Sequence, residues 1–376
     1  MTIAVHISLG ETPDDVRSEY NYQCFSRMAL QEPGDHFIFI FDKPFAASLI
    51  ISKNITPVLL GPVLKNRLLK HYWYQFKLPR VLDRYRADVY VNQDKMACLR
   101  TGTAQMMILE DLAFMDKSGG YNAGERRYLK KYFPLFLQKA DQIGVMNESL
   151  GNRLREKYPA LSEKISRLVP YISPGTNTEN EHAQLNIEEL TGGRSYFVFL
   201  VTGLTSMHTT LALKAFSIFK KWQKSNMQML LLSTRTEKGF SVENLATYKY
   251  RDEVKIATPV DNTGWQTILS GAYATLYLPV ADIPEQASLN CLSCGSPLIC
   301  TDSPFHRSRY GEAALYSSLT ESAIAEKMMR LYKDESLRTE IIHSGNRLAA
   351  SSGVDQAVSA LRHALLGKKG LTFAAQ

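Results

Sequence analysis

The stretch LPVADIPEQASLNCLSCGSPLICTD, residues 278–302, decides the fold because it joins two apolar runs through a loop and a helical segment. YATLYLP (273–279) and SPLICTD (296–302) have the composition of buried strands, and the small residues between them are typical of a packed helix. Asp282 and Asn290 lie eight residues apart around the junction of loop and helix. This spacing raises the question whether the pair forms a ligand site.

The same alternation of strand and helix extends outward over the whole chain, which is the pattern of a parallel sheet wound on both faces. Helical patterns such as 67–86, 125–140 and 321–366 separate the apolar runs. We predict strands at TIAVHIS (2–8), FIFIF (37–41), ITPVLL (55–60), DVYV (88–91), QMMIL (105–109), QIGVM (142–146), RLVPY (167–171), SYFVFLVTG (195–203), MQMLLLS (227–233), DEVKIA (252–257), YATLYLP (273–279) and SPLICTD (296–302).

A polar segment with Pro174, Gly175 and a terminal pair of glycines interrupts this pattern at residues 173–193 and is the best linker candidate. A chain of 376 residues also exceeds the usual size of one hydrophobic core. The sequence therefore predicts two α/β domains, 1–172 and 194–353, and a C-terminal helix and tail at 354–376. Ligands of such sheets bind at the carboxyl ends of the strands, so the loops after residues 203, 233, 257, 279 and 302 matter most.

The composition narrows the classes of function only slightly. The formal charge of +7 comes from 44 Lys and Arg against 37 Asp and Glu, and no recognised nucleic-acid-binding module accompanies it. No run approaches the ~20 apolar residues that span a bilayer, and the N-terminus lacks the features of a signal peptide, so we expect a cytoplasmic protein. The C-x-x-C of Cys291 and Cys294 is half of a metal site, a redox pair or two buried thiols, and the surrounding small residues favour thiols.

The order of these features resembles the GT-B glycosyltransferases, and within them glycosyltransferase family 4. The segments that carry the resemblance are HYWYQFKLPRVLDRYRADVYVNQD (71–94), ILEDLAF (108–114), YLKKYFPLFLQKADQIGVMNESLGNRLREKYP (128–159), SYFVFLVTG with TTLALKAFSIFKKW (209–222), and residues 278–302 with YGEAALY (310–316). The resemblance implies two Rossmann-like domains facing a cleft. A nucleotide-sugar would bind the C-terminal domain and an acceptor the N-terminal one, with retention at the anomeric carbon and without a metal or cofactor. It also implies that the helix at 354–366 crosses back to the first domain.

Two family glutamates fall on Asp282 and Asn290 when the opening stretch is aligned on Gly295. Asn290 keeps an oxygen that can accept a hydrogen bond from a ribose hydroxyl, although a neutral acceptor forms weaker bonds than an ionised one. Asp282 keeps the charge but is one methylene shorter, and Glu285 is placed to compensate. The alternative is that Asp282 is a loop acid and Asn290 a helix surface residue.

The loop TGLTSMHTT (202–210) departs further from the family, which usually has a cationic pair there against the donor diphosphate. Aligned on Gly203, this chain has His208 and Thr209 instead. A helix that begins near Thr209 would present free N–H groups and a positive dipole end to a phosphate. Hydroxyl groups of Thr205 and Ser206 would add donors. Arg235, with Lys238 in STRTEKG, either supplies the missing charge or is a solvated loop residue.

Glu110 stands where the family often has a histidine before Asp-Leu. An acid at the end of a strand would face the reacting sugar, and with Asp282 it is a candidate catalytic residue. The alternative is a cap for the following turn.

The segment LKNRLLKHYWYQFKLPRVLDRYR (64–86) mixes basic and aromatic residues. It fits either a peripheral contact with an anionic membrane at the inner face, or core aromatics with a solvated face. Taken together, we expect a retaining glycosyltransferase that passes a sugar to a glycan or lipid-linked acceptor in polysaccharide assembly. The alternative is a relative that has lost catalysis and acts as a binding or scaffolding partner.

Overall fold

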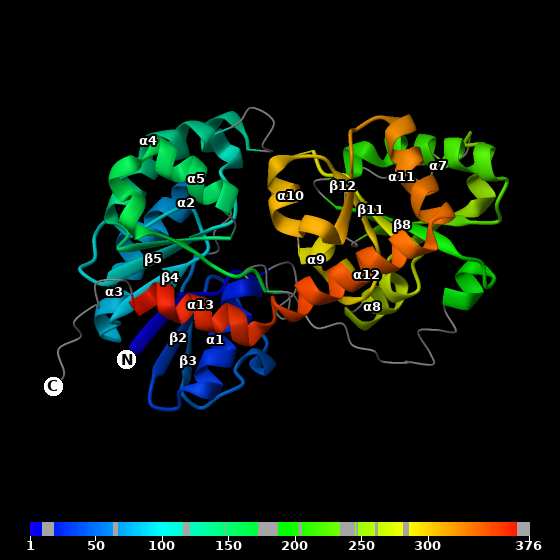
Figure 1. Cartoon of the computed structure of the whole chain (residues 1–376). Coiled ribbons are helices and arrows are strands. Elements are labelled where there is room, and N and C mark those ends of the chain that lie inside the picture. The colour runs from blue at the N-terminus through cyan, green and yellow to red at the C-terminus, as the bar shows by residue number, and fades with distance from the viewer. Residues whose placement is uncertain are drawn as a thin grey trace. The chain divides into compact units, whose positions relative to one another are not determined.

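The chain forms two compact units, Met1–Tyr171 with Val354–Gln376 and Ile172–Gly353. The computed structural model in Figure 1 describes residues 1–9, 19–62, 67–115, 121–146, 148–171, 187–202, 205–233, 245, 247–259, 262–280 and 286–366. Of the predicted linker 173–193, only residues 187–193 lie in the described part. They are the end of a helix (187–191) and a turn in which Gly192 and Gly193 have positive φ angles of 61° and 70°.

Unit 1 is built on a parallel sheet with the strand order β3-β2-β1-β4-β5-β6-β7. Ile3 of the first strand pairs with Phe37 on one side and Val89 on the other, so the order reverses between β1 and β4. The strands are β1 (Thr2–His6), β2 (His36–Phe41), β3 (Ile55–Leu59), β4 (Val89–Asn92), β5 (Ala104–Leu109), β6 (Gln142–Val145) and β7 (Ile165–Arg167).

Helices cover both faces of this sheet because its strands are apolar on both sides. Ile3 and Val5 face one apolar cluster, whereas Ala4 faces the other, which includes Trp73 and Phe133. The helices are α1 (Glu19–Gln31), α2 (Arg67–Tyr72), the π-helical turn η2 (Trp73–Lys77), α3 (Leu78–Arg84), α4 (Ala123–Lys139), α5 (Glu148–Lys157) and α13 (Val354–Leu366), with short 3₁₀ turns η1 (Ala47–Leu49), η3 (Ala113–Met115) and η4 (Pro159–Lys164).

Helix α13 packs in unit 1 beside α1 (Figure 1). Apolar side chains of α13, among them Leu361, belong to the same cluster as Ile3. The carboxylate of Asp355 accepts hydrogen bonds from Arg27 Nε at 2.7 Å and from Gln31 Nε2 at 2.8 Å. The C-terminal end of the described chain is therefore fixed to the first sheet.

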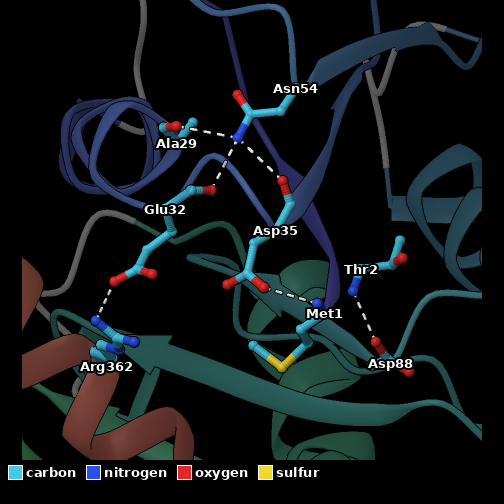
Figure 2. Close-up of polar contacts among 8 residues, drawn as sticks. All are labelled: Met1, Thr2, Ala29, Glu32, Asp35, Asn54, Asp88 and Arg362. Atoms are coloured by element: carbon cyan, nitrogen blue, oxygen red, sulfur yellow. Dashed lines mark hydrogen bonds and ion pairs between the residues drawn. The ribbon is translucent and has the colours of Figure 1, made fainter. Parts of the chain in front are cut away.

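Polar contacts also join the first strand of unit 1 to the elements beside it (Figure 2). The amide Nδ2 of Asn54 lies 3.0–3.1 Å from the carbonyl oxygens of Ala29, Glu32 and Asp35. The N-terminal amino group donates to Asp35 at 2.7 Å, and Arg362 of α13 pairs with Glu32. These contacts join the end of α1, the turn after it and α13 to the sheet.

Unit 2 repeats the design with the strand order β10-β9-β8-β11-β12-β13, all parallel, and its order reverses between β8 and β11. The strands are β8 (Tyr196–Val201), β9 (Gln228–Ser233), β10 (Val254–Ala257), β11 (Ala274–Tyr277), β12 (Leu298–Thr301) and β13 (Ala314–Ser317). The helices are α7 (Thr209–Gln223), α8 (Asn262–Ser270), α9 (Gln286–Ser293), α10 (Pro304–Tyr310), α11 (Glu321–Lys333) and α12 (Glu335–Ala350), with 3₁₀ turns η5 (Ser206–His208), η7 (Arg251–Glu253) and η8 (Gly311–Ala313).

Three local predictions differ from the structure. Strand β7 covers Ile165–Arg167 rather than 167–171, where Pro170 has no N–H for a sheet. Strand β13 was not predicted because its two central residues are only half-buried, so it lacks a continuous apolar run. The stretch 321–366 is three helices, and the first break comes at Asp334, whose side chain caps α12 by accepting from Leu337 N at 2.9 Å.

Candidate functional site

The carboxyl ends of β8 and β11 form the topological switch point of unit 2, the place where ligands of such sheets bind. His208 ends the 3₁₀ turn η5 that follows β8, and its Nδ1 lies 2.8 Å from the carbonyl oxygen of Leu278, directly after β11. A carbonyl only accepts, so Nδ1 carries the proton and Nε2 of a neutral ring is an acceptor. The predicted diphosphate loop is thus joined to the second strand of the switch point.

The hydroxyl groups of Thr205 and Thr209 are used inside this loop. Thr205 is buried, donates to Leu200 O and accepts from Thr202 N at 2.8 Å. Thr209 Oγ1 donates to Ser206 O at 2.8 Å. These side chains shape the loop, and Ser206 is left half-exposed within it.

The N-terminus of α7 also differs from the prediction of free N–H groups near Thr209. The N–H of Thr209, expected to be free, donates to Ser206 O because the turn η5 leads directly into α7. The N–H of His208 likewise donates to Thr205 O at 2.8 Å. A phosphate seat made of free N–H groups at Thr209 is therefore absent from this described loop.

Asn290 lies on α9, the helix after β11, and is half-buried. The helix is held by Ser288, whose hydroxyl lies 2.7 Å from the hydroxyl of Tyr310 in α10. Asn290 and His208 thus belong to the two elements that follow the two strands of the switch point. The other predicted donor residues, Gly203, Arg235, Asp282 and Glu285, lie outside the described residues.

The C-x-x-C pair consists of free thiols. Cys291 is buried and Cys294 half-buried, and burial raises the pKa of Cys294 to about 11 and that of Cys291 further. Both are therefore protonated near neutral pH and poor nucleophiles. Within the described ranges, no group of three or more His, Cys, Asp or Glu side chains is placed to hold a metal ion.

Glu110, the predicted acid of unit 1, follows β5 and accepts a hydrogen bond from Gln93 Nε2 at 2.7 Å. Its neighbour Asp111 caps the following turn, since Asp111 Oδ1 accepts from Ala113 N at 2.8 Å. Gln93 belongs to the loop after β4, and the carboxyl end of β4 is at the switch point of this sheet. Glu110 is therefore one hydrogen bond away from that switch point.

A network around Asp94 occupies the same loop and was not singled out from the sequence. Tyr74 OH donates to Asp94 Oδ2 at 2.6 Å, His6 Nδ1 lies 3.3 Å from the same oxygen, and Lys70 Nζ lies 3.5 Å from Oδ1. Burial alone would raise the pKa of Asp94, but the charge of Lys70 and the hydrogen bonds from His6 and Tyr74 hold it well below its usual range. Asp94 therefore stays ionised, and its charge raises the pKa of Lys70.

Lys95 and Asp111 form a second ion pair beside it, with Nζ and Oδ2 2.9 Å apart. Only 16% of the Lys95 side chain and 8% of the Asp111 side chain are exposed. Burial lowers the pKa of Lys95, but Asp111 and Tyr121 outweigh this and raise it overall. Lys95 is thus charged in a largely buried position.

A cavity of about 110 Å³ lies beside these two networks. Its walls include Lys70, Gln93, Asp94, Lys95, Tyr121 and Tyr128. One feature of the sequence could have indicated this cavity: the polar run NQDK (92–95) directly follows the buried run DVYV. In a parallel sheet, a run that follows a strand lies at the edge where ligands bind.

No family model and no curated protein matches this sequence. Among solved structures, WaaG, a glycosyltransferase involved in lipopolysaccharide biosynthesis, is 12% identical, with a TM-score of 0.71 over 98% of this chain and 100% of that one. HepE from Anabaena, solved in complex with UDP, is 11% identical, with a TM-score of 0.69 over 97% and 99% of the chains. A UDP-N-acetylglucosamine 2-epimerase from Listeria monocytogenes, so described provisionally, is 10% identical, with a TM-score of 0.63 over 97% and 96%.

These similarities show that the chain has the two-domain GT-B fold, as predicted from its sequence. Because the fold is shared with both transferases and an epimerase, it does not select the reaction by itself. In the described part of the chain, no helix combines the length and apolarity needed to cross a membrane.

Proposed function

We propose that this protein is a glycosyltransferase that takes a sugar from a nucleotide-sugar donor and passes it to a glycan or lipid-linked acceptor in polysaccharide assembly. The observation that carries the proposal is the switch point of unit 2, where His208 joins the loop after β8 to the end of β11. Two further points support it: HepE, which has the same fold, was solved with UDP, and Asn290 lies on the helix after β11. Retention at the anomeric carbon and transfer without a metal or cofactor follow from the resemblance to family 4.

The residues of unit 2 take different roles in this proposal. Asn290 accepts a hydrogen bond from one ribose hydroxyl and donates one to the other, because a carboxamide carries both an acceptor and donors. His208 and Ser206 contact the diphosphate, while Thr205 and Thr209 hold the loop in shape through the backbone bonds described above. Gly203, Arg235, Asp282 and Glu285 are assigned to the donor by the sequence alone. Glu110 is assigned to the reacting sugar from unit 1.

Nucleotide binding tests this proposal most directly. We expect the protein to bind at least one of UDP, GDP and ADP below millimolar concentration in isothermal titration calorimetry. The variant Asn290→Glu should bind the same nucleotide about tenfold more tightly, because an ionised acceptor forms stronger hydrogen bonds with the ribose, by about 1–1.5 kcal/mol in total.

Asn152→Glu is the matched control, since it adds the same charge at an exposed position of α5 in unit 1. Its affinity should equal that of the parent protein. If no nucleotide binds at millimolar concentration, the alternative of a non-catalytic scaffold with this fold is correct. If Asn290→Glu abolishes binding, Asn290 does not face the ribose.

We further propose that α2 and η2 bind an anionic membrane surface, where a lipid-linked acceptor is found. The segment has two faces: Trp73 and Tyr74 are buried in the core, whereas Leu68, Tyr72 and Phe76 are 73%, 42% and 38% exposed. The rings of Tyr72 and Phe76 stack with their centroids 5.6 Å apart, and Cζ of Arg100 lies 4.3 Å from the ring centroid of Phe76. Exposed apolar side chains beside cations are the features of an interfacial helix.

Vesicle sedimentation tests this surface. The double variant Leu68→Glu/Phe76→Glu should bind vesicles that contain phosphatidylglycerol at least tenfold more weakly, since each apolar side chain contributes about 1.5–3 kcal/mol when buried. Leu30→Glu is the control, because Leu30 is 52% exposed on α1, which covers the other face of the sheet. Equal losses for both variants, or no binding by the parent protein, would contradict a docking role for α2 and η2.

A further inference from the structure

The cavity at the switch point of unit 1 has walls of mixed chemistry. The loop after β4 supplies Gln93, Asp94 and Lys95, and α2 supplies Lys70. Tyr121 lies just before α4, and Tyr128 lies in α4. Met96 and Leu129, both buried, add an apolar surface. Aromatic and apolar walls with a few converging polar groups are typical of small-molecule sites.

Three cations (Arg67, Lys70 and Lys95) and two carboxylates (Asp94 and Glu125) line this cavity, and most of these charges are already paired, which argues for a neutral ligand. Lys70 lies 3.5 Å from Asp94, and Lys95 lies 2.9 Å from Asp111, so two of the cations already have a carboxylate partner. Arg67, at the exposed rim, donates Nη1 to Gly124 O at 2.7 Å, and Glu125 adds a further negative charge to the wall. A phosphate bound here would therefore face two carboxylates of the wall, Asp94 and Glu125.

The geometry of Asp94 suits hydroxyl groups. Its Oδ2 already accepts from Tyr74, while Oδ1 has only the longer contact with Lys70, 3.5 Å, among the interactions described. Lys70 Nζ has three protons, and its side chain is 39% exposed, so it can donate to a ligand that bonds Oδ1. An acceptor and a donor side by side match the two functions of a sugar hydroxyl.

We propose that this cavity binds a neutral sugar unit of the acceptor, with Asp94 accepting from and Lys70 donating to its hydroxyl groups. The inference rests on the proposed transfer reaction for its role, although the binding itself does not. Gln93 forms part of the wall and donates to Glu110 at 2.7 Å, so the bound sugar lies beside the acid assigned to the reaction. The acceptor is then a glycan whose end unit is uncharged.

The test is saturation-transfer difference NMR on the full chain without nucleotide. The probes are the methyl glycosides of glucose, galactose, mannose and N-acetylglucosamine, and at least one should show saturation transfer. For that glycoside, Asp94→Asn should weaken binding about tenfold, because a neutral acceptor forms weaker hydrogen bonds. Lys70→Gln should weaken it by a similar factor, and its half-exposed side chain makes this variant safe for folding.

Asp355→Asn is the control, since this carboxylate is 54% exposed and bonds Arg27 and Gln31 of α1. It should leave glycoside binding unchanged. Absence of transfer from every glycoside, or displacement of the bound glycoside by inorganic phosphate at equal concentration, overturns the inference. Calorimetry with UDP on Asp94→Asn separates the two proposals, because nucleotide binding in unit 2 should be unaffected. Glycoside binding without any nucleotide binding would remove the proposed reaction and leave the sugar site.

Discussion

The variant Asp111→Asn should lose about 3–5 kcal/mol of the free energy of unfolding. The substitution keeps an oxygen that can accept from Ala113 N, but it removes the negative charge 2.9 Å from Lys95 Nζ. The ammonium group would then be largely buried without a counter-charge, and a broken buried pair costs much more than the pair contributes when intact. Urea unfolding of the parent and the variant measures the difference.

A surface pair provides the comparison for Asp111. Asp355 pairs with Arg27 across α13 and α1, and their side chains are 54% and 43% exposed. Asp355→Asn should therefore cost less than about 1 kcal/mol. The double variant Lys95→Met/Asp111→Leu should recover much of the loss, since no charge is left buried. Equal costs for Asp111→Asn and Asp355→Asn would mean that the Lys95 ammonium is solvated.

Trp73→Ala should destabilise the protein by about 3–5 kcal/mol, the range for removing a fully buried large aromatic side chain. Trp73 has no exposed surface and packs in the cluster between the sheet of unit 1 and the helices on that face. Its Nε1 donates to Leu60 O at 2.6 Å, and its ring lies 4.9 Å from that of His6. The variant would leave both a cavity and a carbonyl without its donor. Thermal and urea unfolding measure the loss.

Trp222 is the matched control, because it is the same residue type at 52% exposure on α7. Trp222→Ala should change the free energy of unfolding by less than about 1 kcal/mol. Trp73→Phe should lie between the two, since it keeps most of the ring volume but loses the hydrogen bond. If Trp73→Ala and Trp222→Ala had similar costs, η2 would contribute little to the core of unit 1.

Most of the fold could be predicted because strands of a parallel sheet are buried on both faces and appear as continuous apolar runs. FIFIF, for example, lies within β2, and MQMLLLS contains β9; the residues of both strands are almost all buried. Strand β13 lacked this signal, because its two central residues, Leu315 and Tyr316, are only half-buried. The break at Asp334 was also missed, since a single capping residue inside a long helical pattern is a weak signal.

The candidate site could be predicted only where its residues are adjacent in sequence. The loop with His208 and the helix with Asn290 each follow one strand, so the pattern of strands located both. The cavity of unit 1 is different, because Lys70, Asp94 and Tyr128 come from three separate segments. No local pattern links these segments, and only the folded unit brings them to one cavity.

By itself, the sequence determined that this chain has two parallel sheets with helices on both faces. The alignment of its loops predicted that the donor binds at the carboxyl ends of the strands in the second sheet. Hydrophobic periodicity carries that information because it records which faces each element buries. Only the tertiary structure decided how the polar groups are used. It showed that the hydroxyl groups of Thr205 and Thr209 bond the backbone, and that Asp94 is held ionised beside Lys70. Whether a polar group bonds its neighbours or is left for a ligand depends on distances of a few ångströms, which only the folded chain sets.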